Sequence, residues 1–447
     1  MTADPQGVRL GYIWLQPGYT KLNGMTLLFI CLTGIPFLVV INFIQPYILT
    51  AMLNLPQEQH GSISGYLAIL HEIIVLCLVG PFGALADRIG RRHLLAVGYI
   101  CTAVGLMAYP WADSTLGLAL IRCIYAVGAA AIVVTYSAVL ADYPQERSRG
   151  KLVAIAAVLN GLGIIGLTVV GGNLPALLIA ADFGPHAAGR LAMALVGIAC
   201  IGCGIIAGAG LKGADRGSGS KNRQPFLQLL RQGFGAAKNP RIAVSYASAF
   251  AARGDVVVIG TYVPLWGTHA GLAQGMTEAE SLVKATIVFV VIQTAALFIS
   301  PLIGILNDRI NRVTALVIGM ALAATGYTLF GLQASPFGDN WVAIALILGV
   351  GQVAAILAGT TLVGQEADPK ITGATIGVWS FCGAFGIMLG SLLGGLLYDF
   401  WKPGAPFLLM GAANFLVMAA ALYVRIKYRQ SEALNIGRTD LLASEKI

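Results

Sequence analysis

Twelve long apolar stretches constrain the fold of this chain more than any other feature of its sequence. An α-helix needs about 20 consecutive apolar residues to cross the hydrocarbon core of a bilayer. Backbone polar groups in lipid must be satisfied within the segment, so such stretches predict helices. They occupy residues 25–53, 62–86, 93–111, 115–140, 150–173, 188–211, 242–267, 282–306, 313–333, 341–364, 371–397 and 404–425.

The composition excludes a soluble fold and argues against a nucleic-acid-binding function. The chain of 447 residues is 57% hydrophobic and 11% charged, whereas soluble domains are about 25% charged. We therefore expect a lipid bilayer as its surroundings and no nucleic acid as partner, despite the net charge of +8. The sequence contains no metal-ligand cluster, nucleotide loop or nucleophile–base pair. We expect no metal, no cofactor and no enzymatic activity.

Lysine and arginine residues predict the orientation in the membrane. Most of the 28 basic residues fall in loops on one side if both termini lie on that side. Because cytoplasmic loops are enriched in Lys and Arg, both termini are predicted to be cytoplasmic. We expect a multi-pass monomer in the plasma membrane, which is the inner membrane if the source is bacterial.

The sequence divides into two six-helix halves joined by a polar linker. In the linker, Phe226, Leu229, Leu230 and Phe234 form one apolar stripe at helical spacing, which predicts a helix on the membrane surface. The predicted organisation is a cytoplasmic segment 1–24, a bundle 25–211, a linker 212–241 with this amphipathic helix, a bundle 242–425 and a cytoplasmic tail 426–447.

The two halves repeat each other. Residues 39–46 align with 257–264, and residues 83–91 align with 304–312, at nearly the same offset. Parallel repeats of this kind are typical of transporters, whose substrate site lies between the halves near the bilayer midplane.

The segment after the second span resembles the signature of the major facilitator superfamily, G-x-L-x-D-R-x-G-R-R. This resemblance implies an all-α fold of twelve transmembrane helices in two pseudo-symmetric bundles, and secondary transport. It also implies an inner gate. The matching residues with assigned gate roles are Gly83, Asp87, Arg88, Gly90, Arg91 and Arg92.

We expect the arginines of this gate to pair with acids at neighbouring inner helix ends. Asp142 is the nearest candidate acid, and Arg149 follows it in the next loop. The alternative is that these arginines serve only membrane topology. In the second half the gate residues are Asp308, Arg309 and Arg312, with Asn311 in the place of Gly90.

Residues 122–130 in the fourth span partly resemble the proton-antiporter motif of the same superfamily. Arg122 and the later small residues match, whereas Tyr125 and Ala126 depart from the pattern. The fifth span matches its own antiporter motif only at Gly171 and Gly172. The resemblance favours the drug-antiporter-like branch.

Two acids, Glu72 and Asp255, lie deep in spans, about 22 Å and about 20 Å from the inner helix ends. Intramembrane acids tend to face a cavity, find a partner or titrate. We therefore predict proton coupling at Asp255 and Glu72. The alternatives are an ion pair of Asp255 with Arg253 or Arg122, and a packing contact for Glu72.

Two arginines and two glutamines complete the candidate site. Arg122 is either a substrate anchor or modulator of a neighbouring pKa, or part of a buried ion pair, and Arg253 can extend inward along its helix. The four charges in the membrane sum to zero. Helices 1, 4, 7 and 10 line the cavity in this superfamily, so Gln45 and Gln352 are candidates for substrate contact, with interhelical hydrogen bonding as the alternative.

These observations predict a proton-coupled secondary active transporter. It would move a small, amphipathic organic solute by rocker-switch alternating access, in the direction of export. The alternatives are a proton symporter or facilitative uniporter for a metabolite, and more distantly a non-transporting receptor or enzyme on the same scaffold.

Overall fold

The computed structural model describes residues 7–212, 226–368 and 370–444. The predicted twelve membrane-spanning helices are confirmed. The first comprises α1 (Lys21–Thr33), α2 (Pro36–Tyr47) and the π-helix η1 (Ile48–Met52). The others are α3 (His60–Ile89), α4 (Arg91–Ala108), α5 (Thr115–Asp142), α6 (Glu146–Ala180), α7 (Pro185–Gly210), α9 (Pro240–Ala273), α10 (Glu278–Arg309), α11 (Arg312–Leu332), α12 (Trp341–Glu366), α13 (Thr372–Phe400) and α14 (Ala405–Ser444).

Short elements connect or flank the spans. Two short strands, β1 (Arg9–Leu10) and β2 (Ile13–Trp14), pair antiparallel ahead of α1. The 3-10 helices are η2 (Gln57–Gln59), η3 (Tyr109–Trp111) and η4 (Ala236–Lys238).

The first span is irregular at two positions, and a proline lies at each of them. α1 ends after Thr33, and α2 begins at Pro36. Proline has no backbone N–H, so a continuous helix would lack one hydrogen bond there. A second proline, Pro46, lies inside α2 and is followed directly by the π-helix η1. Both irregularities lie within one continuous apolar stretch, so hydropathy alone predicted a single unbroken span.

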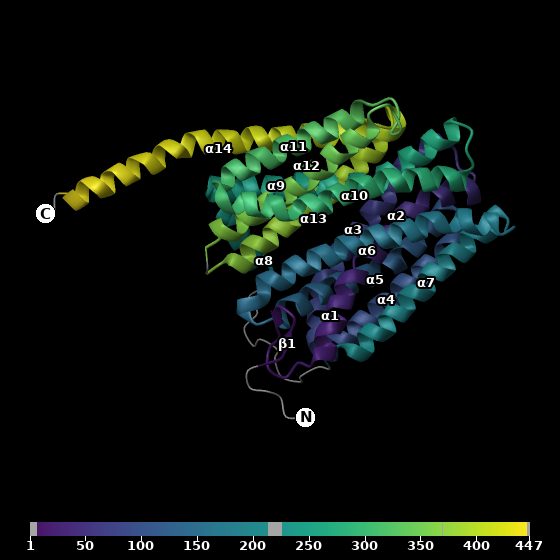
Figure 1. Cartoon of the computed structure of the whole chain (residues 1–447), viewed down its shortest axis with the longest axis horizontal. Helices are drawn as coiled ribbons and strands as arrows, with labels where there is room; N and C mark the ends of the chain where they lie inside the picture. The colour runs from purple at the N-terminus through teal and green to yellow at the C-terminus, as the bar shows by residue number, and fades with distance from the viewer. Residues whose placement is uncertain (1–6, 213–225, 369, 445–447) are drawn as a thin grey trace.

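The spans form two bundles that lie side by side (Figure 1). The N-terminal half contains α1 to α7, and the C-terminal half contains α9 to α14. Packing of α3 on α13, α2 on α9 and α6 on α10 joins the halves. The backbones of α3 and α13 approach closely, because a Cβ atom added to Gly395 of α13 would overlap the backbone of Gly61 in α3.

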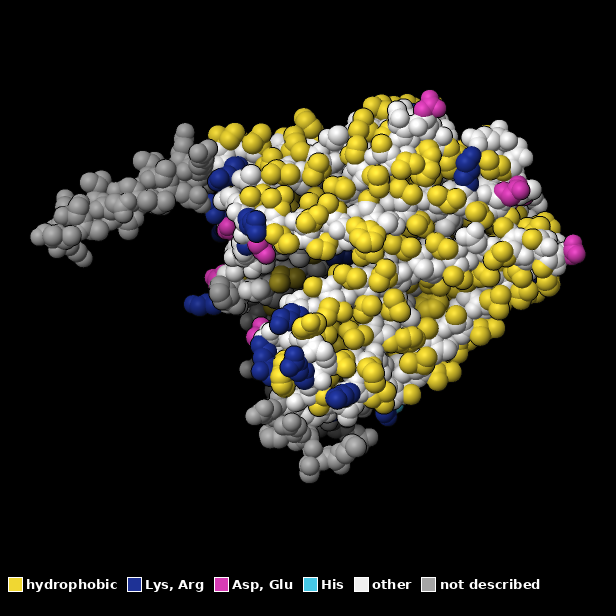
Figure 2. Space-filling view, in the orientation of Figure 1, with side chains coloured by type: hydrophobic (Ala, Val, Ile, Leu, Met, Phe, Trp, Pro, Cys, Tyr) yellow, Lys and Arg dark blue, Asp and Glu magenta, His cyan; other side chains and the backbone are white. Residues whose placement is uncertain are grey.

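The two ends of the bundle differ in charge, and we call them the basic end and the closed end. The basic end carries residues 88–92, 147–151 and 309–312, and its arginine and lysine side chains gather on the left in Figure 2. The closed end carries residues 54–61 and 398–404. The predicted cytoplasmic position of the basic end stays a prediction.

The linker contains the helix α8 (Phe226–Gly235). α8 packs against α13, and the carbonyl of Gly233 accepts a hydrogen bond from Tyr246 Oη at 2.7 Å. Leu230 packs toward Val378, whereas Phe234 is 48% exposed. Placement on the membrane surface stays a prediction. The linker also contains a run of glycine and serine at residues 217–220, which lies outside the described residues.

The amino-terminal hairpin is tied to the loop between α5 and α6. Trp14 donates its backbone N–H to Ser148 Oγ at 3.0 Å, and its carbonyl accepts from the Gln145 N–H at 2.8 Å. The Arg147 guanidinium lies 4.0 Å from the centre of the Trp14 ring. Residues 7–24 of the segment predicted only as a cytoplasmic extension therefore pack on the N-terminal half.

Candidate functional site

A cavity of about 200 Å³ lies between the two halves, near the middle of the long helices. Its wall comes from α2, α3, α5 and α6 on one side and from α9, α10, α12 and α13 on the other. The apolar part includes Val39, Ile164, Val257 and Phe289. The polar lining residues are Asn42, His71, Glu72, Arg122, Arg253, Gln293 and Gln352.

Arg122 is the buried cation of this cavity. Its side chain projects from α5, and the residue is 3% exposed. Nη2 donates a hydrogen bond to Asn42 Oδ1, and the guanidinium lies 5.4 Å from the centre of the Tyr125 ring. Nε and Nη1 have no hydrogen-bond partner among the described residues. Within the described ranges, no carboxylate lies within 4.0 Å of this guanidinium.

Glu72 and Arg253 enter the cavity from opposite halves, on α3 and α9. In the part of the chain that the structure describes, no ion pair within 4.0 Å joins them. The Arg253 guanidinium lies 5.7 Å from the centre of the Trp379 ring. His71 lies beside Tyr125, with ring centres 5.6 Å apart.

Asp255 lies elsewhere. Its carboxylate is fully buried inside the C-terminal half, where Asn414 Nδ2 of α14 donates to Oδ1 at 2.8 Å and to Oδ2 at 3.0 Å. The predicted alternative of an ion pair with Arg253 or Arg122 is wrong. Residues two apart on a helix point about 200° apart, so Arg253 and Asp255 cannot both face the cavity. The proton-carrying role of Asp255 is untested, but its side chain does not line this cavity.

The two candidate glutamines have different positions. Gln45 is buried outside the cavity, where Nε2 donates to Ser64 Oγ at 2.7 Å and Oε1 accepts from Tyr109 Oη at 2.9 Å. These contacts agree with interhelical hydrogen bonding, which was the alternative to substrate contact. Gln352 lines the cavity, and its Oε1 has no partner among the described residues.

Sequence reasoning assigned no binding role to Asn42 and Gln293, which also line the cavity. Both were recognisable as polar residues in apolar spans. Their direction around the helix depends on packing that the sequence alone did not reveal.

At the closed end, a carboxylate of one half binds the start of a helix in the other. Asp399 of α13 accepts hydrogen bonds from the backbone N–H groups of Gly61 at 2.8 Å and Ser62 at 2.6 Å, in the first turn of α3. We call these three groups the Asp399 latch. A carboxylate at a helix N-terminus is favoured by both the free amides and the helix dipole.

Two histidines extend this contact. His60 Nδ1 lies 2.9 Å from His269 Nε2, and His269 Nδ1 lies 2.9 Å from Tyr398 Oη. His60 Nε2 lies 3.0 Å from the Leu55 carbonyl, which can only accept. With neutral rings, the chain of donors therefore runs from Tyr398 through His269 to His60 and Leu55. The sequence showed these histidines only as scattered residues, 209 positions apart.

At the basic end, the following ion pairs each join residues of the same half. Arg91 pairs with Asp142, and Arg149 pairs with Glu146 at 2.8 Å. In the second half, Arg312 pairs with Asp308 at 3.1 Å and Arg241 pairs with Glu366 at 3.1 Å. A hollow between the halves is visible at this end in Figure 2.

The two copies of the signature turn differ in structure. Gly90 has φ +90°, a conformation that suits glycine. Asn311 instead caps α11, accepting from the N–H groups of Val313 and Thr314. Gly83, Asp87 and Arg88 lie in the last turns of α3, Arg92 in the first turn of α4, and Arg309 at the end of α10. The gating role of these residues stays a prediction.

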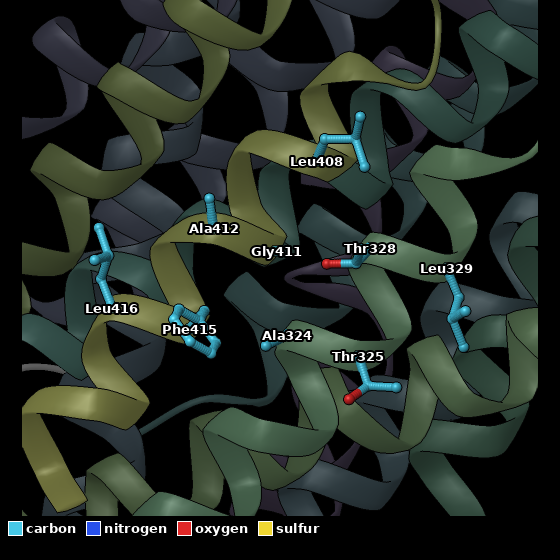
Figure 3. Close-up of a pocket in the computed structure, with 9 residues that line it drawn as sticks. All are labelled: Ala324, Thr325, Thr328, Leu329, Leu408, Gly411, Ala412, Phe415 and Leu416. Atoms are coloured by element: carbon cyan, nitrogen blue, oxygen red, sulfur yellow. The ribbon is translucent and has the colours of Figure 1, made fainter.

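A second hollow, of about 640 Å³, lies on the outside of the C-terminal half between α11 and α14 (Figure 3). Its wall is mostly apolar, and Phe415 and Leu416 are 56% and 69% exposed. Thr325 donates its hydroxyl to the Ala321 carbonyl of its own helix. This surface faces away from the other half, so it is not the candidate site despite its size.

Comparison with known proteins places these features in a family. The sequence profile of the Major Facilitator Superfamily matches residues 25–299 and 276–441. The magnetosome protein MamH of Paramagnetospirillum magneticum is 26% identical over 395 residues, covering 86% of this chain and 88% of that protein. The methyl viologen resistance protein SmvA of Salmonella typhimurium is 24% identical over 412 residues, covering 83% and 82%.

A solved structure shares the fold. The nucleoside transporter NupG superposes with a TM-score of 0.68 at 14% identity, over 91% of this chain and 99% of that chain. At this identity the similarity shows the arrangement of the helices alone.

Proposed function

Because this chain belongs to the Major Facilitator Superfamily, we propose that it is a secondary active transporter that moves a small organic solute by alternating access. The observation that carries the proposal is the cavity between the halves, to which both halves contribute charged side chains. A solute bound there contacts both halves, so their relative movement can change the side from which it is reached.

The closed end supports one state of this cycle. The Asp399 latch and the His60–His269 contact join the halves there, while the ion pairs described at the basic end stay within each half. This arrangement is expected of a state open toward the basic end. In the opposite state the latch must break, and the predicted gate would close.

We further propose that Glu72 carries the coupled proton. It is the carboxylate among the described cavity-lining residues, and Arg253 faces it from the other half. When the halves move, the separation of Glu72 from Arg253 changes, and with it the stability of the charged carboxylate. Transport that is unaffected by uncouplers would instead favour facilitated diffusion.

The direction we propose is export. The partial antiporter motif at residues 122–130 supports it, as does the similarity to SmvA, which is named for resistance. We do not extend methyl viologen itself to this chain, because a dication would meet two guanidinium groups and one carboxylate in the cavity.

Alternating access can be tested without knowing the substrate. Spin labels on Glu58 and Trp401 would report the closed end, and labels on Lys151 and Lys238 the basic end, all at exposed positions. Accessible native cysteines would first be replaced by serine. The proposal requires two distance populations at each pair, with the longer distance at one end accompanying the shorter at the other. A single rigid distance at both ends, under all conditions of pH and gradient, would refute it.

A further inference from the structure

The position of Asp255 changes the charge of the candidate binding site. If both acids and both arginines faced the cavity, their charges would cancel. With Asp255 bonded to Asn414 inside the C-terminal half, the described lining holds Arg122, Arg253 and Glu72. Its formal charge is therefore positive by one unit, with His71 neutral.

The excess charge can be assigned to Arg122. Glu72 faces Arg253 across the cavity, so these two can compensate each other. Arg122 is 3% exposed and its neighbours are uncharged, namely the Asn42 amide oxygen, the Tyr125 ring and the Tyr109 hydroxyl, and Nε and Nη1 meet no geometric hydrogen-bond criterion among the described residues. A buried charge without a counterion is unfavourable, and more so in a membrane.

We propose that the solute is a small organic monoanion, with a carboxylate that binds beside Arg122. This inference rests on the transport function proposed above. A planar guanidinium offers charge-assisted, paired hydrogen bonds to a carboxylate, which would supply the missing counterion. Glu72 opposes a second negative charge, so a monoanion is favoured over a dianion.

The rest of the cavity lining limits the polarity and size of the part of the solute beyond its carboxylate. Val39, Ile164, Val257 and Phe289 form an apolar wall, which suits a hydrocarbon or aromatic group. The amides of Gln293 and Gln352 offer hydrogen bonds without charge. A volume of about 200 Å³ is comparable to an acid of the size of benzoate or hexanoate.

The test compares probes that differ in charge but little in shape. Benzoate, benzamide and benzylammonium form one series, and hexanoate, hexanamide and hexylammonium form a second. Binding to the purified protein would be measured by calorimetry and by thermal shift. The wild type is expected to bind at least one of the two carboxylates tenfold or more tightly than the matching ammonium compound.

Variants assign this preference to one side chain. Arg122→Gln should lower carboxylate affinity at least tenfold and leave amide affinity nearly unchanged, while Arg122→Lys should retain part of the preference. Arg190→Gln is the matched control, because Arg190 of α7 stacks on Trp111 at 4.1 Å and does not line the cavity. Should Arg122→Gln fail to fold, the lysine variant and Arg253→Gln supply the comparison.

Three results would overturn the inference. They are binding of the ammonium compounds as tight as that of the carboxylates, an unchanged preference in the Arg122 variants, and a lack of binding by every carboxylate. The spin-label distances described above test alternating access separately. If the halves alternate between two states but binding is selective for cations, the proposal of an anionic solute is refuted and the proposed transport function stands.

Discussion

The Asp399 latch makes the sharpest prediction about movement of the two halves. Replacing Asp399 by Asn keeps the size of the side chain but removes its charge. One oxygen remains to accept a hydrogen bond from Gly61 or Ser62, and the new Nδ2 group faces the other N–H as a second donor. The state with this end closed should therefore lose stability relative to the state with it open.

The magnitude follows from the contacts. The two bonds have donor–acceptor distances of 2.8 and 2.6 Å, and hydrogen bonds to charged groups contribute about 1.5–3 kcal/mol each. Losing one bond and the charge at the helix N-terminus, at a partly exposed site, should cost about 2 kcal/mol. Since about 1.4 kcal/mol changes an equilibrium tenfold, the ratio of open to closed should rise about 30-fold.

Distances between spin labels on Glu58 and Trp401 would measure that ratio directly. The variant should gain a longer-distance population at this end, and the pair on Lys151 and Lys238 should gain a shorter one. Asp113→Asn is the control, because Asp113 is an exposed acid in the loop before α5 at the same end.

A ratio that is unchanged in Asp399→Asn would refute the reasoning, provided that the wild type shows both populations. So would an equal shift in the Asp113 control, which would reveal a general charge effect.

Three further predictions concern coupling and stability. Glu72→Gln should abolish proton movement into proteoliposomes followed with a pH-sensitive dye while solute binding remains, and equal proton flux in the variant would remove Glu72 as the carrier. Gly90→Ala, at φ +90° and ψ +142°, should destabilise the protein by about 1–3 kcal/mol and lower Tm, whereas Gly150→Ala, where an added Cβ meets nothing within 4 Å, should not. Asn414→Ala should leave the Asp255 carboxylate buried without its donor and lower the free energy of unfolding by about 1.5–3 kcal/mol; the double variant with Asp255→Asn should recover part of that loss.

The spans and their number could be predicted because hydropathy depends on local sequence alone. Depth along a helix could be predicted as well, since each residue adds about 1.5 Å. Direction around the helix could not. Arg253 and Asp255 have nearly the same depth, and the sequence indicates that they point apart without indicating which one faces the cavity. The partner that decides it, Asn414, lies 159 residues away.

The closed-end contacts were beyond sequence reasoning for a related reason. His60 and His269 come from different halves, and Asp399 binds backbone groups that every residue type possesses. A search for complementary side chains therefore finds no partner for Asp399. Gly90 was recognisable from the signature, but its need for positive φ becomes visible only in the turn between α3 and α4.

Because its donors are backbone N–H groups, the Asp399 latch is more sensitive to substitution of the acceptor, Asp399, than to substitution of the donor residue Ser62. Substituting Ser62 by any residue except proline leaves its N–H group in place, whereas at Gly61 an added Cβ would lie 2.5 Å from Asp399 Oδ1 and 2.7 Å from the Gly395 carbonyl oxygen. The acceptor, in contrast, depends on a single codon. Genetic suppressors of an Asp399 variant consequently cannot restore the contact through a new charge pair with those amides, and are expected instead in residues that destabilise the opposite state of the transporter.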